Sequence, residues 1–263
     1  MGAGQLLCPP AVQSNGRANN RVMTISPLEA YLDLQLRFAE RYCALTDVPV
    51  ANAIGKCTNL RRRFGLWGPA GDRAWAAFLQ EIPSCAQHRD LLRLTLSAAS
   101  AAPTVRQSPF GCFSYDPGGA DRTLRLHFMP DPRHRRSSPL ASSSTHERHA
   151  ELRALFAEVR RQHPDVQQVL GFSWLYHTQA YTRLFPPAYV ESLVPAEGPL
   201  HLNGSSIWGQ VLNHRHQLKP GVADLVLDGL QPSTVDFPWR AFPLQPLVAY
   251  CSAEHFFNWF AVE

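Results

Sequence analysis

The chain has 263 residues, of which 45% are hydrophobic and 17% are charged, a composition typical of folded globular proteins. Its net charge is only +4, and its densest basic runs, RRR at 61–63 and RHRR at 133–136, are short. Nucleic-acid binders usually concentrate basic charge on one face or tail, so this weak excess predicts no nucleic-acid partner. Nowhere do eighteen apolar residues run without a charge, which predicts no membrane-spanning helix.

The opening residues 1–24 predict a disordered extension, because they are rich in Pro, Gly and Asn and lack a continuous apolar core. Met23 is an alternative start of translation. The six cysteines contain no C-x-x-C pair, and the opening shows no secretory signal. We therefore expect reduced thiols and a cytoplasmic protein.

Residues 25–102 predict a helical region. The first helix begins after Ser26, a suitable N-cap, with Pro27 at the first helical position and Glu29 at the third. Apolar residues then recur at helical spacing. Three more helices are expected at 49–65, 72–82 and 85–100.

Residues 103–263 predict a mixed β-sheet flanked by helices, so that the whole chain is expected to be α+β. Residues 110–116 and 123–130 read as a hairpin around PGGADR, with Arg125 and His127 pointing away from the face that carries Leu124 and Leu126. The remaining expected elements are a helix at 146–163, a strand at 166–176, a short helix at 178–185, strand structure at 200–212, a helix at 218–230, and a Pro-rich, aromatic tail that wraps the surface from 231 onward.

Three groups of residues are candidates for chemistry. His127, near the end of a predicted strand, is a candidate general base, and Ser173 and Tyr176 follow in GFSWLY. A second segment, GSSIWGQVL, offers Ser206, Trp208 and Gln210 as donors, acceptors and a large ring. If the two segments are neighbours, these groups converge on one cleft that Arg125 also lines. Alternatively, Trp174 and Trp208 anchor the core and their polar neighbours cap the ends of strands.

Several motifs point away from particular activities. GFSWL lacks the second glycine of G-x-S-x-G, so Ser173 does not predict a Ser-His-Asp hydrolase. Cys112 has no adjacent cationic residue and reads as a buried thiol. The pairs His146 with His149 and His214 with His216 lack the surroundings of a metal centre, and no metal site is predicted.

The motifs SPLEAYLDLQLRFAERYCALT, TNLRRRFGL, GCFSY, SWLYHTQAYTRLFPPAY and SSIWGQVL resemble a family of mostly proteobacterial proteins of unassigned activity, from about Ile25 onward. The chain departs from that family at His177, where asparagine is expected. Within residues 124–212, the motifs LHFMP, SPL, FSWLY, LFP and SSIWGQVL also resemble the C-terminal half of GNAT-like acyltransferases. That second resemblance implies an acyl-CoA cofactor held by Arg133, Arg135 and Arg136 beside a helix N-terminus, with His127 as base and Tyr176 as proton donor.

Two functions from different classes follow. One is a GNAT-like acyltransferase that modifies a small molecule in the cleft around His127, Ser173 and Ser206. The other is a non-catalytic module that binds a ligand or a protein. An enzyme requires a deep pocket in which His127 and Tyr176 approach one reacting atom. A binding module requires a shallow apolar patch, with those side chains satisfied by the protein itself.

Overall fold

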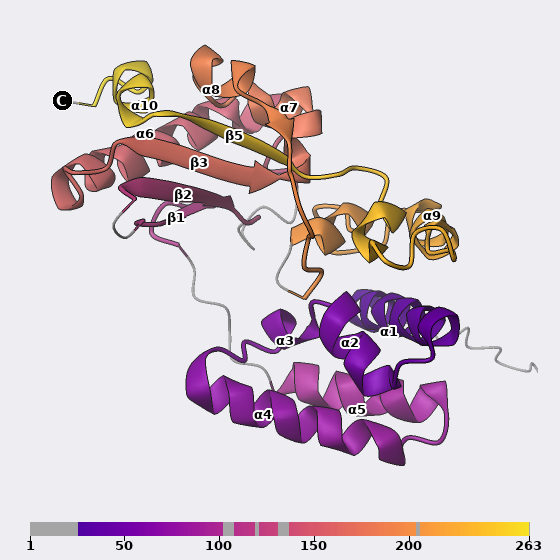
Figure 1. The fold of residues 1–263 in the computed structure, drawn as a ribbon. Helices are drawn as coiled ribbons and strands as arrows, with labels where there is room; N and C mark the ends of the chain where they lie inside the picture. Colours follow the sequence, from indigo (N-terminus) through magenta and orange to yellow (C-terminus); the bar gives the residue numbers. More distant parts are fainter. Residues whose placement is uncertain (1–25, 102–107, 119–120, 131–136, 204–205, 263) are drawn as a thin grey trace, which may run out of the picture.

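The structure is a computed structural model, which describes residues 26–101, 108–118, 121–130, 137–203 and 206–262. It combines a group of N-terminal helices with a mixed sheet that helices cover on one side, so the predicted α+β class is confirmed (Figure 1). None of the helices in these ranges is both long and apolar enough to cross a membrane.

The N-terminal helices follow the predicted order. Their bounds are α1 Pro27–Thr46, α2 Val50–Cys57, α3 Leu60–Arg63, α4 Gly68–Glu81 and α5 His88–Ser100. The predicted cap of α1 is confirmed, since Ser26 Oγ accepts a hydrogen bond of 3.1 Å from the Glu29 N–H. The single helix expected at 49–65 is instead α2 and α3, because Thr58 adopts an extended conformation and the Asn59 N–H donates to Gln35 Oε1 at 2.8 Å.

The sheet has five strands in the order β1-β2-β3-β5-β4. Their bounds are β1 Phe113–Asp116, β2 Thr123–Phe128, β3 Gln168–Ser173, β4 Val194–Pro195 and β5 Leu247–Ser252. The hairpin of β1 and β2 is antiparallel as predicted, whereas β2 and β3 are parallel. Parallel neighbours need a long crossover, and helix α6, Thr145–Gln162, supplies it.

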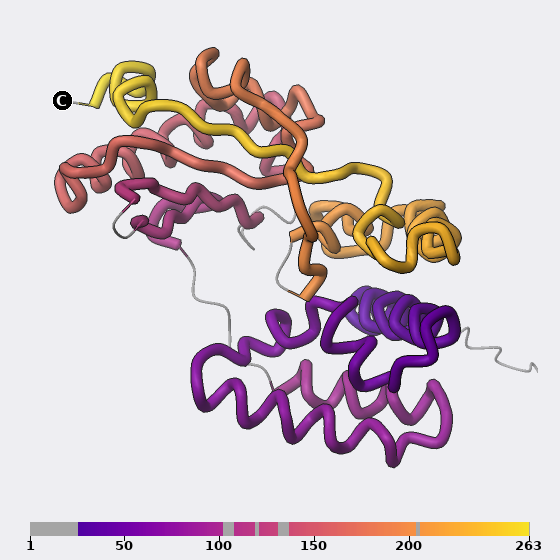
Figure 2. The backbone as a smooth tube through the Cα atoms, viewed as in Figure 1, coloured from indigo at the N-terminus to yellow at the C-terminus, as the bar shows by residue number. Residues whose placement is uncertain are grey.

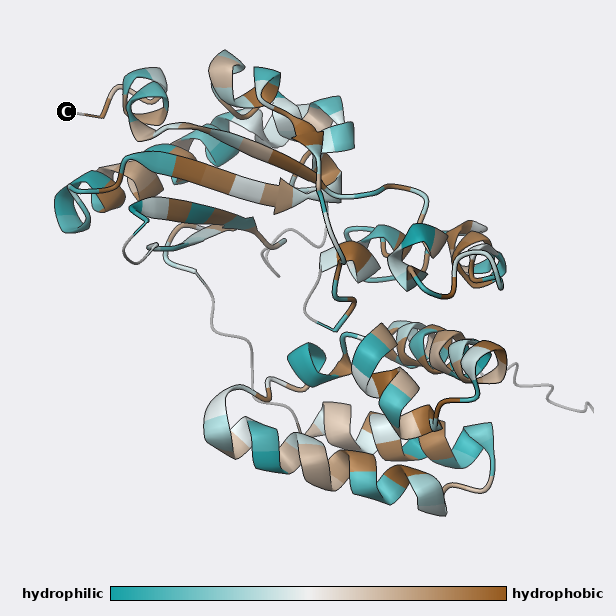
Figure 3. Ribbon diagram, in the orientation of Figure 1, coloured by the Kyte–Doolittle hydropathy of each residue, from teal (hydrophilic) through white to brown (hydrophobic). Residues whose placement is uncertain are grey.

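One face of the sheet is covered by helices. Leu126, Val169 and Ala249 point to that face and pack with side chains of α6, α7 (Gln179–Thr182), α8 (Pro187–Glu191) and α10 (Ala253–Trp259), which lie on one side of the sheet in Figure 1. In Figure 3 much of β3 is hydrophobic. The predicted alternation in β2 is confirmed, because Leu124 and Leu126 are buried while Arg125 and His127 are exposed.

Residues 202–242 differ most from expectation. The strand structure predicted at 200–212 is wrong, since Ser206–Val211 form a 3-10 helix, η5, that buries Ile207, Trp208 and Val211. These residues, together with α9 (Val222–Gly229, predicted as a helix), pack in one core with the N-terminal helices rather than with the sheet. Figure 2 shows this orange segment beside the indigo helix α1. The tail was expected to wrap the surface, but it supplies β5 and α10.

Helices α1 and α5 are joined by one histidine between two carboxylates. His88 Nε2 lies 2.8 Å from Asp33 Oδ1, and His88 Nδ1 lies 2.9 Å from Glu40 Oε2. Partial burial lowers the pKa of His88, but the hydrogen bonds to Asp33 and Glu40 outweigh that effect and raise the pKa above its usual value of 6.5. A charged His88 therefore stabilises the folded state.

The substitution His88→Gln tests this contact. Because the folded-state pKa is raised, the contribution is fully present below about pH 6 and is lost as pH rises through the folded-state pKa. Urea unfolding should show the larger loss of stability in the acidic range. The exposed His255 on α10 gives a matched control, His255→Gln, for which little change is expected at any pH. A loss in His88→Gln that is equal at acidic and alkaline pH would contradict the electrostatic role.

Candidate functional site

The predicted site residues lie in three separate places rather than around one cleft. Ser173 and Tyr176 lie on the covered side of the sheet. Trp208 and Gln210 pack against the N-terminal helices. Arg125 and His127 lie on the uncovered face of the sheet. Ser206 begins η5 and is exposed. Arg133, Arg135 and Arg136, expected to hold acyl-CoA, lie outside the described residues.

Tyr176 is sealed beneath packed rings. Only 5% of it is exposed, its hydroxyl lies 2.7 Å from the hydroxyl of Tyr189, and the rings of Tyr181 and Phe185 pack against it. Burial raises the pKa of Tyr176 well above its usual range, and the neighbouring Tyr189 raises it further. The side chain therefore does not reach solvent as the expected proton donor.

Ser173 caps a 3-10 helix rather than facing a substrate. Its Oγ accepts a hydrogen bond of 3.1 Å from the Leu175 N–H at the start of η4, Trp174–His177. The expected proximity of the two segments does exist at one point. A Cβ added to Gly209 would lie 3.7 Å from Trp174 Nε1. This contact joins the Trp174 side chain to the backbone at Gly209 and does not bring together the polar groups proposed for catalysis.

Trp208 and Gln210 are also satisfied internally. Trp208 is fully buried, donates from Nε1 to the Cys57 carbonyl at 3.1 Å and packs edge-on against Phe242. Gln210 donates from Nε2 to the Leu244 carbonyl at 2.7 Å and accepts the Leu244 N–H at 3.0 Å. The contacts of Trp208 match the alternative in which it anchors the core, whereas Gln210 fixes the backbone of Leu244 rather than capping the end of a strand.

His127 has a partner that was not predicted. Its Nε2 lies 2.8 Å from Asp116 Oδ2, and both side chains are exposed. The hairpin register places Ser114 directly opposite His127 and Asp116 opposite Arg125, all on the uncovered face. The alternation of FSYD against TLRLHF would have predicted this cluster. A carboxylate can orient an imidazole for proton transfer, but neither of the hollows described below includes these residues.

The uncovered face also carries an apolar surface on its other strands. Strand pairing places these residues on the same face, opposite to Val169 and Ala249. Phe172 is 43% exposed, Tyr250 is 52% exposed and Val194 is 47% exposed. We call this group the apolar sheet surface; it consists of Leu170, Phe172, Val194, Val248 and Tyr250.

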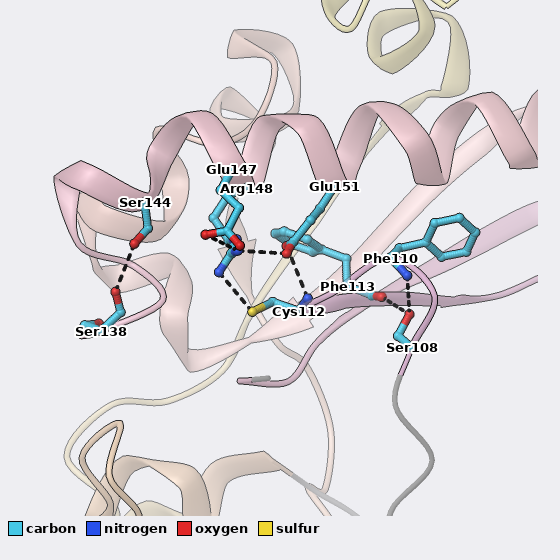
Figure 4. A network of polar contacts seen from close by, with 9 residues as sticks. All are labelled: Ser108, Phe110, Cys112, Phe113, Ser138, Ser144, Glu147, Arg148 and Glu151. Carbon is cyan, nitrogen blue, oxygen red and sulfur yellow. Dashed lines mark hydrogen bonds and ion pairs between the residues drawn. The ribbon is translucent and has the colours of Figure 1, made fainter. Parts of the chain in front are cut away.

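Beneath the opposite face, a buried arginine ties helix α6 to the start of β1 (Figure 4). The guanidinium of Arg148 lies 2.7 Å from Glu151 Oε1 and 2.9 Å from Glu147 Oε2, and it donates to Cys112 Sγ at 3.1 Å. Glu151 also accepts the Cys112 N–H at 3.1 Å. Contrary to the sequence expectation, the Cys112 thiol therefore has a cationic neighbour.

The spacing of α6 could have revealed this arginine. Arg148 precedes Leu152, Leu155 and Val159 on the buried stripe of the helix. Gly111 adjoins the network with a φ of +61°, and a Cβ there would overlap the Glu151 carboxylate. Cys112 is only 1% exposed. The network of Arg148, Glu151 and Cys112 is thus a buried structural contact between α6 and the start of β1, closed to solvent, rather than a reactive centre.

Two hollows lined by described residues lie away from His127. The larger, of about 900 Å³, lies between residues 195–200 and 237–246 and is lined by prolines and by Phe237, Trp239 and Phe242. The smaller, of about 700 Å³, lies at the start of α1 and is lined by Tyr31, Arg63 and the turn at 215–216. Among the described residues that line them, neither hollow includes His127, Ser173 or Tyr176.

The substitution Gly171→Ala tests the packing that seals Tyr176. A Cβ at Gly171 would overlap the hydroxyls of both Tyr176 and Tyr189, so overpacking should cost about 1–3 kcal/mol of unfolding free energy. The control is Gly55→Ala in α2, where nothing lies within 4 Å and a gain of about 0.5–1 kcal/mol is expected. Chemical denaturation measures both variants. Equal stability of the two would refute the close approach.

The substitution Arg148→Met tests the buried network of Arg148, Glu151 and Cys112. It leaves the 12%-exposed Glu151 carboxylate without its buried cation, and loss of one partner of such a pair costs about 3–5 kcal/mol. The exposed pair of Arg161 with Glu158 on the same helix provides the control Arg161→Met, for which a change within about 0.5 kcal/mol is expected. Urea unfolding followed by circular dichroism compares the two. A small effect in both variants would show that Arg148 is dispensable.

Comparison with known proteins adds no template for this site. No family model matches the chain, and the comparisons with curated proteins and with solved structures also give no match.

Proposed function

We propose that this protein is a non-catalytic binding module whose contact surface is the apolar sheet surface. The observation that carries the proposal is the exposure of large apolar side chains on a sheet face that the described residues leave uncovered. Contiguous apolar patches of this kind mark interaction sites on soluble proteins.

The geometry of the two rings supports this proposal. Leu170 pairs with Tyr250 and Phe172 pairs with Val248, so the two aromatic side chains are diagonal neighbours on adjacent strands. Aromatic residues provide large contact area with few rotatable bonds and are enriched at the centres of interfaces. A rigid sheet holds both rings in place before a partner arrives.

The internal satisfaction of the polar groups favours binding over catalysis. Tyr176 is bonded to Tyr189, Ser173 to the backbone of Leu175, and Gln210 to the backbone of Leu244. These are the contacts expected of a binding module, in which the side chains in question serve the fold.

The partner is a protein with an exposed apolar segment rather than a nucleic acid. Beside the apolar sheet surface lie Arg125 and the pair of His127 with Asp116, a nearly balanced set of charges. Binding to a phosphate backbone requires several unopposed cations. The apolar surface itself is complementary to hydrophobic side chains.

We propose the bacterial cytoplasm as the compartment. The described cysteines are free thiols, in keeping with a reducing environment; they are Cys43, Cys57, Cys85, Cys112 and Cys251. The acyltransferase is the second candidate function, and the pair of His127 with Asp116 is the observation that favours it.

Selection of displayed peptides tests the binding surface. A library of random peptides of about twelve residues is selected on the full chain and counter-selected on the double variant Phe172→Ser, Tyr250→Ser. We expect enriched apolar peptides that bind the wild-type chain at least about tenfold more tightly than the double variant. Fluorescence anisotropy of the labelled peptides measures the affinities.

The control is Trp67→Ser, which removes a 62%-exposed ring from the helical half. Peptides that lose affinity equally for this control would contradict the assignment of the surface. Binding of single-stranded oligonucleotides to the same face would overturn the choice of a protein partner. Stabilisation by acetyl-CoA that depends on His127 would support the acyltransferase instead.

A further inference from the structure

The hollow at the start of α1 lies apart from the sheet and carries concentrated positive charge. Four segments line it: α1, the end of α3, the end of α5 and the turn at 215–216. Arg63 and Arg215 line its walls, and across the described residues neither forms an ion pair with a carboxylate. Two arginines without acidic partners beside one hollow create a positive potential inside it.

The guanidinium of Arg63 packs over the ring of Tyr31 in a cation–π contact. Its guanidinium carbon lies 4.8 Å from the centroid of the Tyr31 ring, which is 2% exposed. The Tyr31 hydroxyl in turn donates to Asn59 Oδ1 at 3.3 Å. This buried support restricts where the planar guanidinium can lie and leaves its N–H groups for a ligand.

Arg215 lies in a turn that its own residues fix. Asn213 Oδ1 accepts the Arg215 N–H at 2.8 Å and the Gln217 N–H at 3.1 Å. His216, which also lines the hollow, has a φ of +60°, a left-handed conformation that is costly for a residue with a Cβ. The turn is therefore held in a strained form that presents its side chains to the hollow.

The other residues that line the hollow indicate which chemical groups a ligand would need besides its negative charge. Leu28, Leu32 and Ala99 supply an apolar lining. The twenty-residue helix α1 begins here and adds the positive end of its dipole, which Glu29 in its first turn partly offsets. A volume of about 700 Å³ is in the range of pockets for small organic molecules.

We propose that this hollow binds a small organic phosphate, with Arg63 and Arg215 gripping the phosphoryl oxygens and the apolar lining contacting the organic body. Guanidinium groups pair with phosphate through two parallel hydrogen bonds, which gives both strength and direction. The site is independent of the apolar sheet surface, so either proposal can fail without the other.

Calorimetric titration of the full chain with phenyl phosphate tests the site. We expect saturable binding with one ligand per chain, weakened at least about tenfold by Arg63→Met and by Arg215→Met. Arg93→Met on α5 is the control, since Arg93 is exposed and paired with Asp90 outside the hollow, and it should bind as the wild type does. Arg63→Lys keeps the charge but not the fork and should fall between wild type and Arg63→Met.

Two further probes identify the chemistry. Benzyl alcohol, which lacks the charge, should not bind, and inorganic phosphate should bind at least about tenfold more weakly than phenyl phosphate because it lacks the apolar body. Equal binding of benzyl alcohol or of inorganic phosphate would overturn the proposal. So would unchanged affinity in both methionine variants, provided that their thermal melting shows folded protein, or no binding of phenyl phosphate to the wild type.

Discussion

The antiparallel pairing of β3 with β5 is the constraint on which the rest of the structure depends. Six residue pairs, from Gln168 with Ser252 to Ser173 with Leu247, join segments that are far apart in the chain. The chain between them leaves the sheet after β4, places Trp208 and Phe242 among the N-terminal helices and then returns. Closing so long an excursion costs chain entropy, which the burial of these rings offsets.

The stretch from Gly171 to Pro187 is dense in polar and aromatic residues because it turns the chain sharply under the sheet. Gly171 leaves room for two tyrosine hydroxyls that bond to each other in a buried space. Ser173 ends β3 by capping η4, and Pro187 begins α8. Polar groups of this kind specify one arrangement of packed rings, because each has a fixed partner. The density of polar groups in this stretch therefore fixes how the chain turns beneath the sheet.

The sequence predicted local structure well where periodicity and capping agree. Helix α1 with its Ser26 cap and the alternation of β2 are examples. It failed at Ser206–Val211, where a short apolar run with glycine suits a strand or a tight helix equally and packing against Phe38 decided the outcome. Strand β5 was missed because flanking prolines and many rings hid a short alternating run.

The candidate sites show the same division between local and long-range information. The pairing of His127 with Asp116 follows from hairpin register and was within reach of the sequence. The approach of Arg148 to Cys112, or of Arg63 and Arg215 to one hollow, depends on contacts between segments distant in sequence. The spacing of residues within one helix or strand cannot predict such contacts between distant segments.

The route of residues 196–246 has a consequence for how the molecule can be divided. The helical core includes Leu202, Trp208, Val226 and Phe242, which the chain reaches only after β1 to β4 have been made. A fragment that stops after α5 would leave Phe38 and Tyr31 without the rings that cover them. During synthesis, the core of the first helices therefore cannot be completed until the last quarter of the chain has been made. The two parts of this protein complete their folding together, and neither is a separable unit.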